Sequence, residues 1–455
     1  MKLGSLFLTA SLAAVALTTS AFADQGRYVI LMKNNSVPAD LEAKVAAAGG
    51  TLVRTIPQVG IAIATSSDAS FASKAKGIKG VQSAGLQTAS TLPATTDAAA
   101  PEAGGAAYSD AGLLWGIDRV GAPAAWANGH TGSHDTVIAI IDTGIAWNHP
   151  DLASNVVYVD CFTSAGSFGD GGCNPYPSQS DHGTHTAGTA AANFGGGVVG
   201  VAPEAGLAGY NVFESIPGCG VCAYSDSRWM AMVDAADRGF QVESMSLGGV
   251  GQYGYGNLQD VSDLATYVAA EKRIANYVNS KGTVMVASAG NEQLNTNGTI
   301  VHVPGDIPQM INVSATGVQP LPRWPQDPAG FDILAFYSNY GAAVTVAAPG
   351  GDCGQIGICD PATRPANWFE YLILSTVVAP NAACAATYSC PVGYGWKGGT
   401  SMATPHVAGV AALIMDADPS KSPNQVEAKI KQSAENIGSR QEFGHGMVRA
   451  DLATE

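Results

Sequence analysis

The sequence predicts an α/β sandwich with a mainly parallel central sheet, preceded by a small α+β unit. Continuous apolar runs at residues 136–141, 283–288 and 342–348 are typical of parallel strands that are buried on both faces. A long apolar helix is predicted at 406–415, and strand and helix patterns alternate between these segments. In sheets of this kind the functional site forms at the carboxyl ends of the strands.

Length, composition and charge agree with this fold and argue against one class of partner. The chain has 455 residues, of which 46% are hydrophobic and 13% charged, so it can bury a large core. The net charge of −15 is unevenly spread: residues 24–90 hold seven Lys or Arg and four Asp or Glu, whereas residues 91–455 hold 14 and 33. An anionic body argues against nucleic acid as a partner, because phosphate groups bind to positive surfaces.

The first 23 residues have the pattern of a secretory signal peptide. Lys2 precedes an apolar run, and Ala21-Phe22-Ala23 matches an A-x-A cleavage site. The run is short for a membrane span and no other stretch is long enough, so we expect no membrane anchor. The sequence therefore predicts a secreted protein, extracellular or periplasmic in transit.

Eight cysteines fall in near-neighbour pairs along the chain. In an oxidising compartment such spacing favours short-range disulfides that close loops. The predicted bonds are Cys161–Cys173, Cys353–Cys359 and Cys384–Cys390. Cys219 and Cys222 have the spacing of a redox motif, but their loop favours a local disulfide, or pairing with other cysteines, over redox catalysis. A zinc site would need two converging ligand pairs, which the sequence does not show.

Composition divides the rest of the chain into three parts. Residues 24–90 predict the small α+β unit, and residues 91–111, rich in Ala, Thr, Pro and Gly without periodicity, are typical of a linker with a processing site. The body then comprises residues 112–455, in which 317–335 and 350–396 have little regular pattern and are predicted to be surface insertions. The elements predicted for the small unit are a strand at 27–32, a helix at 39–48 and a strand at 60–64.

Asp142 and His182 are the first two candidates for chemistry. Asp142 directly follows a predicted strand, where Gly144 allows a sharp turn; a turn or helix-capping carboxylate is the alternative interpretation. A histidine such as His182 is the usual general base near neutral pH. His185, three residues further on, offers the alternative of a metal pair, but no HExxH pattern or acidic ligand set supports one.

Ser401 is the third candidate. It follows Gly398-Gly-Thr at the predicted start of a helix, which exposes the hydroxyl and directs the backbone N–H outward at the positive helix end. This geometry suits a nucleophile whose attack creates an oxyanion. An ordinary N-cap serine is the alternative, and the Gly-x-Ser-x-Gly elbow of esterases is absent.

Together the three stretches resemble the subtilisin family of serine proteases. The motifs are IDTGI at 141–145, DHGTHTAGT at 181–189 and GTSMATPHVAG at 399–409, in the order of the family. The resemblance covers the chain from Leu114 to its end. It implies a three-layer α/β sandwich, a serine endopeptidase activity and a triad of Asp142, His182 and Ser401.

Further residues carry over from the family's motifs. Asn291 in Ser288-Ala-Gly-Asn resembles the oxyanion donor. His302 aligns with the floor of the pocket for the residue before the cleaved bond (P1), unless the alignment slips and His302 lies on a loop. The resemblance also implies that residues 24–90 are an inhibitory, chaperone-like propeptide, an intramolecular partner of the enzyme. The substrate-binding residues implied are Ser246, Leu247, Gly248, Gly290 and His302.

The family resemblance also bears on metals and substrates. Asp151 in HPDL matches a calcium ligand, although it also suits a helix cap, and the Gly-rich loop at 192–200 departs from the family's calcium loop. Structural calcium is expected, but no cofactor for catalysis. We expect a monomer that cleaves proteins or peptides with broad specificity, because substrate is bound through its backbone. A narrow processing protease and an inactive binding protein are the alternatives.

Overall fold

The computed structural model describes residues 26–87, 89–92, 95–99, 112–251, 261–298, 300–318, 332–353, 362 and 366–455. The predicted signal peptide at 1–23, most of the predicted linker and Cys359 lie outside the described residues. Within the described residues, no helix has the length and apolar character needed to cross a membrane.

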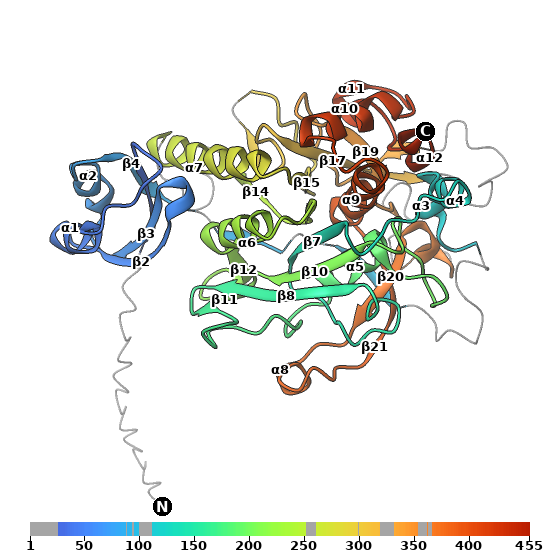
Figure 1. Cartoon of the computed structure of the whole chain (residues 1–455), viewed down its shortest axis with the longest axis horizontal. Helices are drawn as coiled ribbons and strands as arrows, with labels where there is room; N and C mark the ends of the chain where they lie inside the picture. Colours follow the sequence, from blue (N-terminus) through green and yellow to red (C-terminus); the bar gives the residue numbers. More distant parts are fainter. Residues whose placement is uncertain are drawn as a thin grey trace, which may run out of the picture.

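A nine-stranded sheet forms the centre of the body in the described chain (Figure 1). Its order is β18-β17-β15-β13-β7-β10-β8-β9, with β19 beside β17. The pairing is parallel along β8, β10, β7, β13, β15, β17 and β19. At the two ends of the sheet, β9 pairs antiparallel with β8 and β18 pairs antiparallel with β17. The strands are β7 (Val137–Asp142), β8 (Val156–Thr163), β9 (Gly166–Ser167), β10 (Gly206–Asn211), β13 (Val242–Met245), β15 (Val284–Ser288), β17 (Met310–Val318), β18 (Asp332–Leu334) and β19 (Val346–Pro349).

The two faces of the sheet bury separate hydrophobic cores, because successive strand residues point to opposite faces. In β7, Ile138 and Ile140 join one core, whereas Ala139 and Ile141 join the other, which explains the continuous apolar run. The first core is covered by α3 (Trp115–Arg119), α4 (Ala122–Ala127), α5 (His182–Ala191), α9 (Thr400–Ala417), α10 (Pro423–Ser433) and α12 (Ala450–Thr454), and the second by α6 (Ser225–Asp237) and α7 (Val261–Ser280). The predicted three-layer α/β sandwich is confirmed.

The N-terminal unit (residues 26–87) is a four-stranded antiparallel sheet of order β2-β3-β1-β4 that lies beside α7 (Figure 1). Tyr28 and Ile30 of β1 pack against the two α-helices of the N-terminal unit, whereas Val29 and Leu31 join the second core of the body. Its elements are β1 (Gly26–Met32), α1 (Leu41–Ala47), β2 (Thr51–Ile56), η1 (Pro57–Val59), β3 (Ile61–Ser66), α2 (Phe71–Lys76) and β4 (Val81–Leu86).

Short strands form at the start of the predicted linker, although its sequence has no strand periodicity. Two short strands, β5 (Ala89–Thr91) and β6 (Thr96–Ala99), pair antiparallel with β12 (Gly220–Tyr224) and β21 (Val392–Gly398). Backbone hydrogen bonds do not require an apolar period, which is why composition did not reveal them. The remaining short strands are β11 (Glu214–Ile216), paired with β12, and β14 (Gly249–Gly251), paired with β16 (Val301–Val303).

The prediction of a surface insertion at 350–396 is wrong for its C-terminal half. Strand β20 (Ile373–Val378) pairs with β21 in a hairpin that packs against α5. The hydroxyls of Ser375 and Thr376 donate to the backbone oxygens of His185 and Thr184, at 2.8 and 2.7 Å. The other short helices of the C-terminal part are η4 (Trp368–Tyr371), α8 (Ala382–Ala385) and α11 (Arg440–Phe443).

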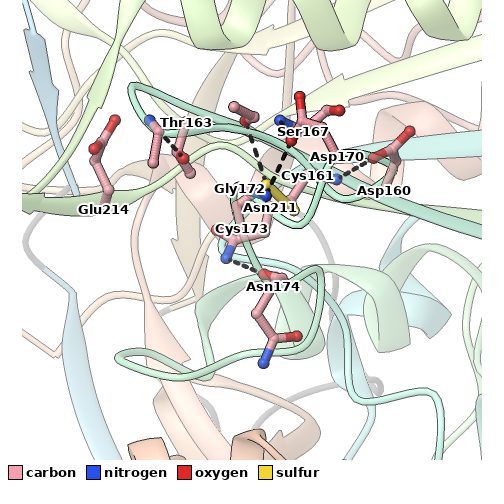
Figure 2. Close-up of a disulfide and its surroundings, with 12 residues drawn as sticks. Asp160, Cys161, Thr163, Ser167, Asp170, Gly172, Cys173, Asn174, Asn211 and Glu214 are labelled. Carbon is pink, nitrogen blue, oxygen red and sulfur yellow. Dashed lines mark hydrogen bonds between the residues drawn. A yellow bond between two sulfur atoms is a disulfide. The ribbon is translucent and has the colours of Figure 1, made fainter.

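Disulfides brace the loops of the body. The structure joins Cys161 to Cys173, Cys219 to Cys222 and Cys384 to Cys390, and Cys353 is also disulfide-bonded. The Cys161–Cys173 bond ties the end of β8 to the loop that continues into Asn174 (Figure 2). The carbonyl of Asn174 accepts a hydrogen bond from Asn211 Nδ2 at 2.8 Å, so this loop is fixed against the carboxyl end of β10.

Candidate active site

Asp142, His182 and Ser401 all lie on elements that meet at the carboxyl edge of the sheet. Asp142 is the last residue of β7, His182 the first residue of α5 and Ser401 the second residue of α9. The three residues have relative exposures of 0%, 1% and 0%. Burial of three polar side chains is costly unless they contact one another or other polar groups.

Asp142 and His182 form a direct hydrogen-bonded pair. The Nδ1 atom of His182 lies 2.8 and 2.9 Å from the two carboxylate oxygens of Asp142. One of these oxygens also accepts the N–H of Thr143 at 2.7 Å. Because a carboxylate only accepts, Nδ1 carries the proton and Nε2 presents a lone pair.

Two glycines allow this pair to form. Gly144 turns the chain after Asp142 with φ +82°, and a Cβ there would lie 2.1 Å from the carbonyl oxygen of Pro175. A Cβ on Gly183 would lie 2.4 Å from the carbonyl oxygen of Gly144. The start of α5 can therefore approach the end of β7 because Gly183 lacks a side chain, and the chain after Asp142 can turn against Pro175 because Gly144 lacks one.

Ser401 contacts the segment that follows β13. Its hydroxyl donates to the backbone oxygen of Ser246 at 3.2 Å, and the hydroxyl of Ser246 donates to the backbone oxygen of Ser401 at 2.7 Å. Among the described residues, the buried Nε2 of His182 has no hydrogen-bond partner. The structure thus has an imidazole nitrogen without a partner at the start of α5 and a hydrogen-bonded serine hydroxyl at the start of α9, on two helices that pack against each other.

Asn291 is oriented by the residue that precedes Ser401. Its Oδ1 accepts the backbone N–H of Thr400 at 2.9 Å and the hydroxyl of Thr400 at 2.7 Å. The amide nitrogen lies 3.3 Å from where a Cβ on Gly399 would stand. The side chain of Asn291 therefore presents its amide donors toward the start of α9, where the backbone N–H of Ser401 also lies. Sequence analysis missed Thr400, whose hydroxyl could have been suspected only from its place beside the serine.

His302 stands between the two segments predicted to bind substrate. It lies on β16, which pairs with β14 just after Ser246-Leu247-Gly248. A Cβ on Gly248 would lie 2.3 Å from the His302 ring, and a Cβ on Gly290 would lie 2.6 Å from it. The ring is 2% exposed and so fills the space between these glycines. His302 therefore lies on a strand, so the alternative that it lies on a loop is wrong.

Burial sets the charge state of His302. Desolvation lowers its pKa, although the carboxylates of Glu292 and Asp306 act in the opposite direction. The ring is therefore neutral around neutral pH. Its Nδ1 has no hydrogen-bond partner within the described part of the chain. An uncharged ring therefore fills the space between Gly248 and Gly290.

His185 is engaged through one of its two ring nitrogens. Its Nε2 lies 3.0 Å from the backbone oxygen of Ile373 and 3.2 Å from that of Gly395, so this nitrogen is the donor. Burial lowers the pKa of the ring well below its usual range. His185 fastens the β20–β21 hairpin to α5 through Nε2, and among the described residues it belongs to no group of three His, Cys, Asp or Glu side chains that could hold a metal.

Asp151 does not match a calcium ligand in this structure. One carboxylate oxygen accepts the backbone N–H groups of Gly197 and Val198 at 2.9 and 3.0 Å, and the other accepts the hydroxyl of Tyr394 at 3.1 Å. Both oxygens thus face hydrogen-bond donors. The partial positive charge on these donor hydrogens disfavours a cation at the same place. Where the chain is described, no group of three His, Cys, Asp or Glu side chains could hold a metal. The Gly-rich loop at 192–200 is fixed by hydrogen bonds to Asp151.

Comparison with known proteins assigns the family. The model of the subtilase family, peptidase S8, matches residues 133–446. The chain is 31% identical over 344 residues to subtilisin of Bacillus pumilus, covering 75% of this chain and 98% of that protein. It is 32% identical over 345 residues to subtilisin Savinase of Lederbergia lenta, with 75% and 98% covered.

Solved structures agree on the fold. The epidermin leader peptide processing serine protease of Staphylococcus aureus superposes with a TM-score of 0.71 at 22% identity, covering 94% of this chain and 98% of that one. Fervidolysin of Fervidobacterium pennivorans, a keratinolytic enzyme related to subtilisin, gives 0.68 at 24% identity, covering 94% and 61%. Because the two structures are only 22% and 24% identical to this chain, they show the fold alone and do not identify its substrate. With the family match over the body, the chain belongs to the subtilase family and is a serine endopeptidase.

Proposed function

We propose that this chain is a secreted endopeptidase that hydrolyses protein substrates through an acyl-enzyme on Ser401. The observation that carries the proposal is the buried Asp142–His182 pair, which leaves the imidazole Nε2 without a hydrogen-bond partner among the described residues, on a helix that packs against α9 and its Ser401. The predicted signal peptide at 1–23 and the disulfides favour secretion. Subtilases need no cofactor for catalysis, and any structural calcium would bind away from Asp151.

In the proposed reaction His182 is the general base. The Ser401 hydroxyl turns from the Ser246 carbonyl toward His182 Nε2, loses its proton to that nitrogen and attacks the peptide carbonyl. Asp142 keeps the imidazole in the Nδ1–H tautomer and stabilises its protonated form. His182 then gives the proton to the departing amine, and water releases the acyl group by the same steps in reverse order.

Asn291 and the backbone N–H of Ser401 are the proposed donors to the oxyanion. Thr400 occupies the Asn291 oxygen, so the amide N–H groups are the atoms directed toward the reacting carbonyl. The N-terminus of the 18-residue helix α9 adds a favourable dipole at the same place. Removing one such donor from subtilisin lowers turnover by about 10²–10³-fold.

Substrate is proposed to bind as an extended strand between β12 and β14. Strand β5 already occupies this position, paired with β12 and lying beside β14. Recognition through the backbone favours broad sequence tolerance. His302 is proposed to limit P1 to small or medium side chains, because its ring fills the space between Gly248 and Gly290.

The N-terminal segment 24–90 is proposed to be an inhibitory propeptide, joined through 91–111 to a peptidase body of residues 112–455. Two of its arginines, Arg27 and Arg54, lie 2.6 and 3.2 Å from the fully buried carboxylate of Asp226 on α6. This contact brings the cationic segment and the anionic body together. Strand β5 at the substrate position supports inhibition by occupancy.

The test is a paired measurement on the purified full chain and its Ser401→Ala variant. Casein hydrolysis and mass-detected labelling by a fluorophosphonate are followed for both proteins. The proposal expects cleavage, one label on Ser401 and processing of the N-terminal segment in the wild type, with all three lost in the variant. A folded wild type that neither cleaves nor labels would favour the inactive binding protein instead.

A further inference from the structure

Residues 89–92 and 95–99 form two strand-like pieces on either side of the Ser401 region. Strand β5 pairs with β12 and lies beside β14, on the side of the proposed substrate strand that precedes the cleaved bond. Strand β6 pairs with β21, which leads directly into α9 and Ser401. The Cγ2 of Thr95 lies 3.5 Å from where a Cβ on Gly399 would stand, so the second piece begins close to the serine.

The direction of the chain gives the two pieces different roles. Because β5 precedes β6 in sequence, hydrolysis between Leu92 and Thr95 would leave β5 on the acyl side and β6 on the leaving-group side. The register places Asp97 directly opposite Lys397 and Ala98 opposite Trp396. Strand β21 thus offers a backbone edge for several residues that follow the cleaved bond.

Lys397 is the charged side chain of β21 that faces this occupant. Its residue is 5% exposed, and its ammonium lies 2.8 Å from an Asp97 carboxylate oxygen and 3.1 Å from that of Asp181. Asp181 directly precedes His182, so the ammonium is held beside the site. The Asp97 side chain is 51% exposed and reaches Lys397 from outside the body. Aside from these two carboxylates, no ion pair of Lys397 occurs among the described residues.

We propose that Lys397 is a specificity-determining residue that selects an Asp or Glu on the leaving-group side of the substrate. Counted from each of the three bonds between Leu92 and Thr95, Asp97 is the third, fourth or fifth residue after the cleaved bond. The inference rests on the proposed function and adds a substrate class to it: extended peptides with a carboxylate at this distance. Asp181 keeps the ammonium positioned when no such substrate is bound.

The strength of the ion pair between Lys397 and the substrate carboxylate should lie between that of a surface pair and that of a buried pair. A half-exposed carboxylate loses part of the interaction to solvent, whereas the buried ammonium on the other side is poorly hydrated. Changing the substrate's Asp to Asn should lower kcat/KM by about five- to thirtyfold. Raising the salt concentration should reduce this ratio, because the pair is open to solvent on one side.

The experiment uses enzyme purified after expression of the full chain, with its active-site concentration set by fluorophosphonate titration. Quenched fluorescent peptides carry the sequence of residues 88–100 with Asp, Asn or Lys at the position of Asp97. The wild type should prefer Asp over Asn by the stated ratio and cleave the Lys peptide most slowly. In Lys397→Gln the Asp-to-Asn ratio should fall toward one, and in Lys397→Glu the Lys peptide should become the best substrate.

Lys429→Gln on α10, which changes a surface lysine far from β21 in sequence, is the matched control and should keep the wild-type ratio. Equal kcat/KM for the Asp and Asn peptides with wild-type enzyme overturns the proposal, even if no Lys397 variant can be purified. A wild-type ratio retained in Lys397→Gln overturns it as well. Failure of the wild type to take up fluorophosphonate would instead refute the proposed function, so the two failures are distinguishable.

Discussion

Glu243 provides a test of how burial sets charge in the core of this enzyme. It lies in the central strand β13, where alternation turns it toward the second core, with Met245, and its register partners are Ala139 and Met285. It is 0% exposed, and neither carboxylate oxygen has a hydrogen-bond partner among the described residues. Burial raises its pKa well above the usual range, and Arg228 only partly opposes this. Arg228 itself is paired with Glu271.

The sign of the pH dependence follows from the raised pKa. Below the unfolded-state pKa of about 4.3, Glu243 is protonated in both states and contributes no pH dependence. Between that value and the higher folded-state pKa, the unfolded chain releases a proton that the folded chain keeps. The free energy of unfolding therefore falls by about 1.4 kcal/mol per pH unit across this window because of Glu243 alone.

The perturbation is Glu243→Met, which has a similar shape and no ionisable group. Relative to the parent, the variant should gain stability progressively as pH rises from about 5, by about 2.7 kcal/mol over two pH units inside the window. Urea unfolding is measured at several pH values on full-length chains that carry Ser401→Ala to prevent self-digestion. Glu243→Gln should remove the same pH slope while keeping a buried polar group.

Glu42→Gln, at an exposed position of α1, is the control and should leave the pH dependence of the parent unchanged. A stability difference between parent and Glu243→Met that is constant from pH 5 to pH 8 would refute the reasoning. So would a slope of the opposite sign, because it would mean that Glu243 is ionised and stabilised in the folded chain.

Three further predictions concern the site. Asn291→Ala should lower kcat by about 10²–10³-fold with little change in KM, as measured by steady-state kinetics, and a change confined to KM would contradict its role as oxyanion donor. His302→Gly should shift P1 preference toward larger side chains on a peptide library, whereas an unchanged profile would remove His302 from the pocket. Asp151→Asn should lower the free energy of unfolding by about 1–3 kcal/mol, because donors then face donors, and EDTA should not change that difference. If Asp151 binds calcium, EDTA will destabilise the wild type and abolish the difference.

Short stretches of sequence were enough to identify the candidate site residues. Asp142 follows an apolar strand and Ser401 follows glycines at a helix start, and both features depend only on neighbours in sequence. The pairing of Asp142 with His182 could be expected from the order of the motifs and the parallel sheet. The distances, the tautomer and the contact of Ser401 with Ser246 required the folded chain.

The errors have a common physical cause. The hairpin of β20 and β21 was expected to be a surface insertion, since its sequence mixes Ser, Thr, Gly and aromatic residues instead of a regular apolar period. Its burial depends on α5, whose backbone oxygens and His185 supply the polar partners. Strands β5 and β6 are formed by pairing with β12 and β21, through backbone groups that every residue carries.

By itself, the sequence determined the α/β class, the Cys161–Cys173 and Cys384–Cys390 disulfides and the approach of His182 to Asp142, because each follows from local periodicity, close spacing or the order of the motifs. Only the tertiary structure decided what Asp151, His302 and Lys397 contact. Their partners lie far away along the chain, and burial against those partners sets which atoms donate, which accept and which charge each group carries. Long-range packing therefore decides the chemistry of these three side chains.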